Sequence, residues 1–190
     1  MNTLQQFSKN RTAQLARKAE RGISFIPILL GLVIVALFTV VVVNQYNDSV
    51  RTTRIEGAKS EITTIISNAQ RSYGAARQFA AVTTPMAING NIIPANMRVG
   101  AGAQNVYDQA VLLVAQTCAV AGDCLRLTYP TAPGDCQEVV LAALPFTRLI
   151  TVGTTVVRPL DGAINMASLN TACNVAAAAS VNVLLDFGFR

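Results

Sequence analysis

Histidine and tryptophan are both absent from this chain of 190 residues, and only 13% of its residues are charged. Without imidazole there is no Ser-His-Asp triad, no Cys-His nucleophile and no zinc site that relies on histidine ligands. The charged fraction is about half of the ~25% that is usual for soluble proteins. In contrast, 52% of the residues are hydrophobic and the mean hydropathy is +0.41. The composition therefore excludes a disordered tail and is untypical of a cytosolic enzyme.

Acidic residues are scattered through the C-terminal part of the chain, and no spacing brings two of them together as glycosidase chemistry needs. Lysine is equally scarce, because Lys59 is the only one that follows the N-terminal 22 residues. We therefore expect no enzyme, no cofactor and no metal site. The acidic residues that we considered are Asp108, Asp123, Asp135, Glu138, Asp161 and Asp186.

Basic residues exceed acidic ones by 15 to 10, a net charge of +5 with a pI of about 9.3. Such a balance usually points to nucleic acid or to an anionic membrane surface. However, residues 1–22 hold five Lys or Arg against one Glu, which leaves 10 basic and 9 acidic residues in the rest of the chain. The excess positive charge therefore lies in the N-terminal segment, where it indicates how the chain is oriented in a membrane. We expect no direct nucleic-acid partner.

An uncharged apolar run covers residues 23–43 directly after this basic segment. As a helix it would span roughly 32 Å at ~1.5 Å per residue, which is enough to cross a bilayer core. The positive-inside rule places the basic N-terminus in the cytoplasm and the remaining residues across the membrane. Residues 23–43 are therefore predicted to be a single transmembrane helix.

Three processing routes fit this N-terminus. A secretory signal peptide would need a small-x-small cleavage site after the apolar run, and the sequence there has none. An uncleaved signal anchor is the second route. The third is a leader that is cut before the apolar run, between Gly22 and Ile23, where the glycine gives a protease close access to the backbone.

Helical periodicity continues beyond the apolar run, with no proline until Pro85. Apolar or small residues recur at spacings of three to four from Val50 to Ala76, which predicts an amphipathic helix. We expect one helix over residues 23–79, about 85 Å long. Two helices with a break near residues 44–48 are the alternative.

The C-terminal part predicts an α+β head in which a small antiparallel sheet packs on the amphipathic half of the long helix. Short β-type runs alternate with two stretches of helical spacing at residues 136–146 and 161–173. The expected strands cover residues 110–117, 125–130, 149–158 and 180–190. The expected organisation is a leader at 1–22, a long helix at 23–79 with its transmembrane part at 23–43, a connecting loop at 80–109, and the sheet with its disulfide-bounded region at 110–190.

All four cysteines lie in the part that is predicted to be exported. An even number of cysteines in that compartment indicates two disulfides, and their spacing matches no common zinc pattern. Three pairings are possible. We favour Cys118 with Cys124, closing a short loop, and Cys136 with Cys173, closing a longer one.

Several segments along the whole chain together resemble a type IV pilin of the type IVb class, similar to the PilS-like prepilins. The resemblance begins with a basic leader that ends in Arg21-Gly22 and with the unbroken apolar helix. It continues in the helix-to-sheet connection and in a C-terminal disulfide-bounded D-region. The matching segments are residues 87–90 (AING), 93–97 (IPANM), Asn105, Cys136 opening a helix, Phe146 before the ITVGTT strand, and Cys173 before a last strand ending in Phe189-Arg190.

This resemblance implies that a prepilin peptidase cuts between Gly22 and Ile23, that the new amine of Ile23 is methylated, and that the subunits polymerise through the apolar helix. Pro27, Gly31 and Val35 would then lie in the assembly surface. The partners would be copies of the same chain, the peptidase, the membrane and the inner-membrane pilus assembly machinery. The chain would pass from the inner membrane to an extracellular pilus that serves adhesion, aggregation or conjugative contact, and Cys118–Cys124 would be an extra bridge.

One position departs from the family pattern. Pilins typically carry glutamate at the fifth mature position, where it can neutralise the terminal amine of a neighbouring subunit, and here that position is Pro27. Proline suits the first turn of a helix but supplies no charge. This keeps open a minor pilin or a secretion pseudopilin, and a non-polymerising, single-pass anchored periplasmic binding domain is the further alternative.

Overall fold

A computed structural model describes residues 25–74, 76, 79–175 and 179–189 of the chain. The chain divides into two compact units, Met1–Asp48 and Ser49–Arg190. The expected leader at residues 1–22 and the Gly22–Ile23 junction lie outside the described residues.

Helix α2 (Phe25–Tyr73) is continuous, so the alternative of two helices with a break at residues 44–48 is wrong. The helix ends at Tyr73 and not near residue 79, as the sequence had suggested. Gly74 follows it, and a Cβ atom there would lie only 2.6 Å from the carbonyl oxygen of Gln70. Glycine is a poor helix former that permits a tight exit from the helix, which explains the early end.

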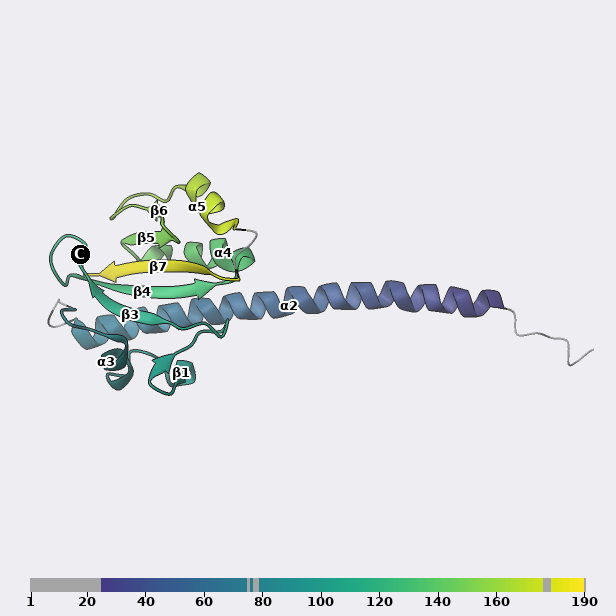
Figure 1. Cartoon of the computed structure of the whole chain (residues 1–190), viewed down its shortest axis with the longest axis horizontal. Coiled ribbons are helices and arrows are strands. Elements are labelled where there is room, and N and C mark those ends of the chain that lie inside the picture. The colour runs from purple at the N-terminus through teal and green to yellow at the C-terminus, as the bar shows by residue number, and fades with distance from the viewer. Residues whose placement is uncertain (1–24, 75, 77–78, 176–178, 190) are drawn as a thin grey trace, which may run out of the picture. The chain divides into compact units, whose positions relative to one another are not determined.

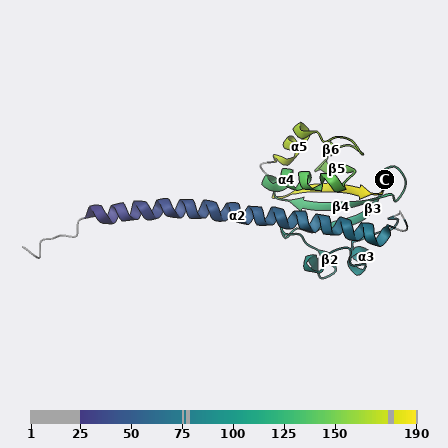
Figure 2. The ribbon, with the colours of Figure 1, turned by 180° about the vertical axis from the view of Figure 1, so that it is seen from behind.

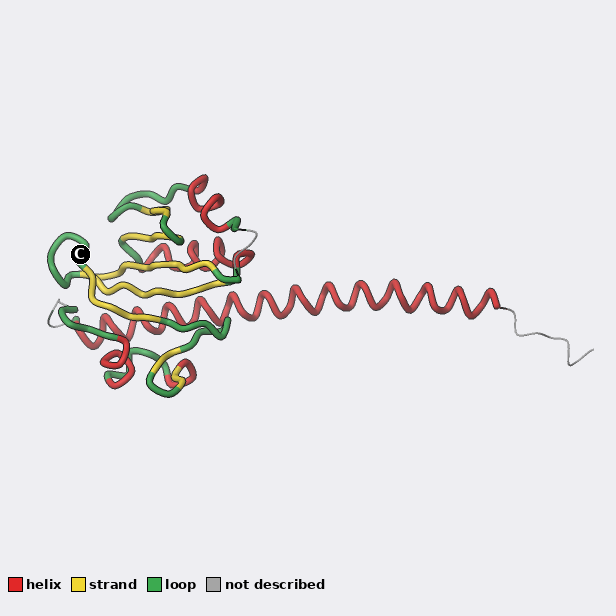
Figure 3. The backbone as a smooth tube through the Cα atoms, viewed as in Figure 1, coloured by secondary structure: helices red, strands yellow, loops and turns green. Residues whose placement is uncertain are grey.

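A five-stranded antiparallel sheet forms the centre of the unit Ser49–Arg190, with the strand order β3-β4-β7-β5-β6 (Figures 1 and 3). Its strands are β3 (Leu112–Gln116), β4 (Cys124–Thr131), β5 (Leu149–Val152), β6 (Thr155–Arg158) and β7 (Val181–Gly188). The C-terminal strand β7 thus lies between β4 and β5. The expected single strand at residues 149–158 is instead a hairpin, because Gly153 turns the chain with a φ of +60°.

Two further helices, α4 (Pro133–Ala143) and α5 (Met166–Cys173), follow the order of the expected helical segments. A 3-10 turn, Leu144–Phe146, extends α4. Helix α4 packs against β4 and β7, whereas α5 contacts α4, β5 and β6. Figure 2 shows α2 and α4 on the same side of the sheet.

One face of the sheet carries the core. The register places Leu125 opposite Phe187, Leu127 opposite Leu185, and Tyr129 opposite Val183, and all six side chains are buried. Because side chains alternate between the two faces of a strand, they all point to the same side. They form one cluster with the buried stripe of α2, which comprises Ala58, Ile62, Ile65, Ile66 and Ala69.

Both edge strands of the sheet are hydrogen-bonded to neighbouring segments. On β3, the Leu113 N–H donates to the Thr84 hydroxyl at 2.9 Å and the Ala115 N–H donates to the Val82 carbonyl at 3.0 Å. On β6, the Val157 carbonyl accepts a hydrogen bond from the Asn165 N–H at 2.8 Å. The described contacts thus occupy two N–H groups of β3 and one carbonyl of β6, which leaves fewer edge groups for pairing with another strand.

The connection at residues 80–109 is more ordered than the expected loop. It contains helix α3 (Thr84–Asn89), a 3-10 turn (Ala95–Met97) and a small hairpin of β1 (Arg98–Val99) with β2 (Gly102–Ala103). Its apolar side chains Ala87, Ile92, Ile93 and Met97 are buried in the common core. Burial of these side chains explains why a segment rich in proline and glycine still adopts a defined structure.

Candidate assembly surface and head sites

The N-terminal part of α2 presents a continuous apolar surface. Its most apolar 18-residue window has a mean hydropathy of 3.1, and none of that window is buried. The large hydrophobic side chains from Phe25 to Val43 are between 46% and 75% exposed. Length and composition are sufficient for this helix to cross a membrane, and water is an unfavourable environment for so large an apolar patch.

Gly31 and Val35 lie within this apolar surface. Val35 is 63% exposed, and a Cβ atom added at Gly31 would meet nothing within 4 Å. The one threonine of the segment, Thr39, donates its hydroxyl to the carbonyl of Val35 at 2.8 Å. This bond satisfies the hydroxyl inside the helix, so Thr39 brings no unpaired donor into an apolar environment.

Pro27 lies in the first turn of the described helix, and that turn contains no acidic side chain. The first acidic residue after Gly22 in the sequence is Asp48. The apolar segment therefore contains no carboxylate that could neutralise a positive charge, such as a terminal amine, in its apolar surroundings.

The favoured cysteine pairing is confirmed: Cys118 is bonded to Cys124, and Cys136 is bonded to Cys173. The second bridge joins α4 to the last residue of α5. The first bridge closes a loop in which the carboxylate of Asp123 accepts the N–H groups of Cys118 and Ala119 at 2.8 and 2.9 Å. The sulfurs of Cys118 and Cys124 lie close to Asp123, but they are bonded to each other and so provide no thiolate to a metal ion.

Most of the scattered acidic residues of the head are bound to arginines. Arg148 lies 2.7 Å from Asp161 and 3.5 Å from Asp123, and Arg126 contacts both carboxylate oxygens of Asp186 at 2.7 Å.

Arg51 on α2 pairs with Asp135 at 2.7 Å and with Glu138 at 3.3 Å on α4. The sixth acid, Asp108, lines a small cavity that is described below. Five of these six acids therefore take part in ion pairs with arginines.

Glu61 is a buried, hydrogen-bonded carboxylate that was not among the candidate residues predicted from the sequence. It is 8% exposed on α2, where it accepts the Tyr129 hydroxyl at 2.5 Å and the Val106 N–H at 3.4 Å. Burial raises the pKa of Glu61 above its usual value, although both hydrogen bonds oppose the shift. Burial and the hydrogen bond to Glu61 also raise the pKa of Tyr129. The signal in the sequence was an acidic residue placed directly beside the apolar stripe of the helix.

A small cavity of about 170 Å³ lies among Arg54, Tyr107, Asp108 and Thr131. The Thr131 hydroxyl is buried there without a hydrogen-bond partner among the described residues, whereas the Tyr107 hydroxyl interacts with the carboxylate of Asp135. Burial and the charge of Asp135 raise the pKa of Tyr107. The Tyr107 hydroxyl therefore stays neutral at ordinary pH and offers only hydrogen bonds.

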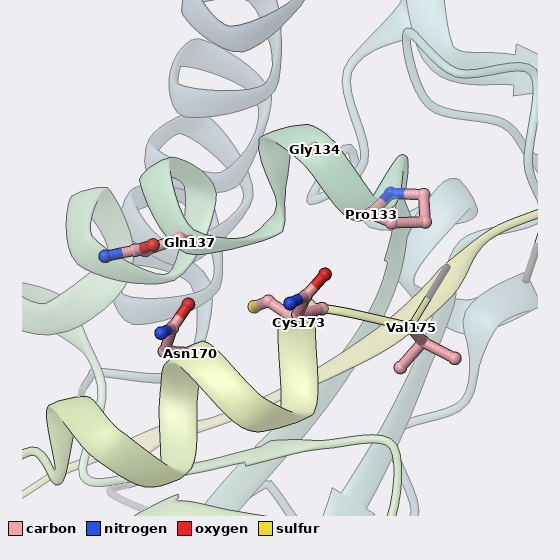
Figure 4. Close-up of a pocket in the computed structure, with 7 residues that line it drawn as sticks. Pro133, Gly134, Gln137, Asn170, Cys173 and Val175 are labelled. Atoms are coloured by element: carbon pink, nitrogen blue, oxygen red, sulfur yellow. The ribbon is translucent and has the colours of Figure 1, made fainter. Parts of the chain in front are cut away.

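A larger pocket of about 340 Å³ lies between α4 and α5, over the Cys136–Cys173 bridge (Figure 4). Figure 4 shows Gln137 on α4 and Asn170 on α5 with both amide groups on the side where the two helices face each other. Asn174, Pro133 and Val175 complete much of the lining. The sequence did not predict this pocket, because its lining residues come from two segments, 133–137 and 170–175, that are far apart along the chain.

The chain combines an apolar N-terminal helix, an antiparallel sheet and a disulfide-bounded C-terminal region, and known proteins share this architecture. The PilS N-terminal family model matches residues 52–185. The crystal structure of TcpA, a type IV pilin from Vibrio cholerae El Tor biotype, is similar with a TM-score of 0.53 and 12% sequence identity. The match covers 70% of this chain and 98% of that chain, and at this identity it shows the fold alone. No curated protein matches the sequence significantly. The family match covers well over half of the chain and agrees with the fold, so this protein belongs to the PilS family of type IV pilins.

Proposed function

We propose that this chain is a structural subunit of an extracellular type IVb pilus and that it polymerises through the apolar surface of α2. Membership of the pilin family supports a pilus subunit in general. The observation that carries the more specific proposal is the uncovered apolar surface from Phe25 to Val43.

The energetics of this surface favour two environments. In the membrane, lipid covers residues 25–43. Outside the membrane, the same side chains can be buried against copies of themselves, with a gain of about 1.5 kcal/mol or more for each large side chain before entropy costs. Over the whole segment the gross gain is roughly tens of kcal/mol, from which the entropy costs of association are subtracted.

Processing precedes assembly in this proposal. A prepilin peptidase cuts between Gly22 and Ile23, and the new amine of Ile23 is methylated. The basic leader holds the N-terminus in the cytoplasm, and the subunit waits in the inner membrane for the pilus assembly machinery. Basic residues before the apolar segment and the glycine at the junction support this route.

The decisive test of polymerisation is Val35→Asp. A charge at the centre of the apolar surface cannot be buried between helices, so we expect loss of filaments in electron micrographs. Val35→Leu is the matched control and should assemble normally. Both variants should keep the Cys118–Cys124 and Cys136–Cys173 bridges and the melting temperature of the head. Normal filaments from Val35→Asp would refute assembly through this surface.

Processing is tested independently by the intact mass of the protein purified from membranes. A species that begins at Ile23 supports cleavage, with a further mass increase for each methyl group. A species that retains Met1 supports the alternative of a single-pass anchored periplasmic binding domain.

Pro27 favours a second candidate, a minor pilin or pseudopilin that initiates or caps a filament made of other subunits. Because residues 23–47 contain no carboxylate, the terminal amine has no acidic partner in its own segment. Electron microscopy of a deletion strain separates the roles. Loss of all filaments indicates a major or initiating subunit, whereas shorter or fewer filaments indicate an accessory one.

The filament is proposed to serve adhesion, aggregation or conjugative cell contact. Each role needs a recognition surface on the head, since the apolar helix is used for assembly. The polar pocket between α4 and α5 is the feature of the head that best suits recognition.

A further inference from the structure

We infer that the pocket between α4 and α5 binds a neutral sugar unit. The inference rests on the proposed adhesive role for its biological use, but the binding itself requires only the folded head. The observations that carry it are the chemistry of the lining, the rigidity of the walls and the size of the cavity.

The lining offers hydrogen-bonding groups that are not used within the protein. Gln137, Asn170 and Asn174 line the pocket, and their side-chain amides have no hydrogen-bond partner among the described residues. Each amide provides two donors and an acceptor with two lone pairs. Sugar hydroxyls also donate and accept, so amides can satisfy them in either direction.

The walls are held in place before any ligand arrives. The Cys136–Cys173 bridge joins the two helices at the base of the pocket. Leu169 and Val140 are fully buried in the common core and anchor α5 and α4 from below. A preformed site avoids the entropy cost of ordering its side-chain supports, and this favours binding of a small ligand.

Helix α4 adds backbone groups to the same site. Its N-terminus, at Pro133 and Gly134, lies in the pocket, and its N-cap residue Ala132 has no side chain that could cap the helix. The Gly134 N–H belongs to the first turn and has no partner within the helix. It is therefore available to an oxygen of the ligand.

The absence of charge in the lining decides the class of ligand. None of the described residues that line the pocket is charged, and the carboxylate nearest to the helix N-terminus, Asp135, is buried and paired with Arg51. The guanidinium of Arg51 donates to the carbonyl of Gly134 at 2.6 Å, but its charge is balanced by the carboxylates of Asp135 and Glu138. A metal ion would find no anionic ligand among the lining residues. Pro133 and Val175 offer apolar contacts that suit the C–H face of a sugar ring.

Size and shape favour a sugar unit over a peptide. The volume of about 340 Å³ lies at the lower end of the range for small-molecule sites. An extended peptide would need a groove or a free strand edge, whereas this pocket is lined by two helices and the residues that follow α5.

The experiment uses the full chain, purified in a detergent without a sugar headgroup. Saturation-transfer NMR with galactose, mannose, N-acetylglucosamine and N-acetylgalactosamine as separate probes should give transfer to at least one of them. A tetra-alanine peptide tests the competing class of ligand. Transfer to the peptide alone, or to none of the probes, would overturn the inference.

Variants locate the binding site. Asn170→Ala and Gln137→Ala each remove hydrogen bonds to the ligand and should weaken binding about three- to tenfold. The matched control is Asn182→Ala, which removes an exposed amide on β7 outside the pocket and should leave binding unchanged. Equal binding by all three variants would show that the sugar binds elsewhere.

The Val35→Asp variant separates this inference from the function on which it draws. It should bind the sugar as the unaltered chain does, even if it forms no filaments. Normal filaments without sugar binding would refute the pocket and leave the pilus function standing, whereas sugar binding by a chain that never polymerises would refute only the filament.

Discussion

Glu61 brings a carboxyl group into the core of the head, where the Tyr129 hydroxyl donates to it at 2.5 Å. Burial disfavours the charged form, so the pKa of Glu61 is raised above 4.5. The folded chain therefore retains this proton at pH values where the unfolded chain has released it. Its contribution to stability is present below about pH 4.5 and is lost as the pH rises through the folded-state pKa.

Glu61→Gln should remove this pH dependence, because glutamine resembles the protonated acid and still accepts from Tyr129. Between about pH 4 and about pH 7, the melting temperature of the unaltered chain should fall relative to that of the variant. Thermal denaturation monitored by circular dichroism measures both. Glu56→Gln, which removes an exposed carboxylate of the same helix, is the control and should leave the slope unchanged. Parallel curves for Glu61→Gln and the unaltered chain would contradict the prediction.

Asp186 depends on a single arginine on the face of the sheet opposite to the core. Its side chain is 2% exposed and accepts two hydrogen bonds from Arg126, which is 31% exposed. Arg126→Met leaves the carboxylate buried without its partner, and we expect a loss of about 1–3 kcal/mol in the free energy of unfolding. Chemical denaturation measures this loss. Lys59→Met, at an exposed position of α2, should change stability by no more than about 0.5 kcal/mol.

At the scale of the elements, the two disulfides close loops of very different length. Cys136 and Cys173 are 37 residues apart in sequence, and Cys118 and Cys124 are 6 apart. In the chain-entropy model, the longer loop contributes about 4 kcal/mol and the shorter about 2 kcal/mol. Replacement of Cys136 and Cys173 by serine should therefore destabilise the head more than the same change at Cys118 and Cys124.

Denaturation of the two double variants tests this order. The longer bridge also fixes α5 against α4, so its loss should weaken sugar binding, and loss of the shorter bridge should not. Equal stability of the two variants would contradict the entropic account of these bridges.

The periodicity of apolar residues predicted which helices and strands form more accurately than it predicted the residues at which they end. The apolar stripe from Val50 to Ala76 predicted the helix, and the buried apolar residues of α2, from Ile55 to Ala69, belong to that stripe. The end of the helix at Tyr73 and the hairpin at Gly153 both depend on how a single glycine is used by the surrounding backbone. Glycine tolerates several conformations, so its presence does not reveal which one the tertiary contacts select.

At the scale of the whole molecule, the core of the head lies entirely within the unit Ser49–Arg190. A fragment that comprises Ser49–Arg190 should therefore fold, form both disulfides and remain monomeric. Size-exclusion chromatography and a non-reducing peptide map check these outcomes. Because the fragment lacks the apolar surface of Phe25 to Val43, it should not form filaments at any concentration. An unfolded or polymeric fragment would contradict this division of the chain.

The sequence by itself determined the apolar segment, the basic composition of residues 1–22, the α+β class and the number of disulfides. Each of these depends on local composition or on a period along one element, which neighbouring residues alone can establish. Only the tertiary structure decided that β7 lies between β4 and β5, that Glu61 meets Tyr129, and that Gln137 and Asn170 share a pocket. Those features join residues that are 31 to 68 positions apart, and their pairing is set by how the whole chain buries its apolar surface.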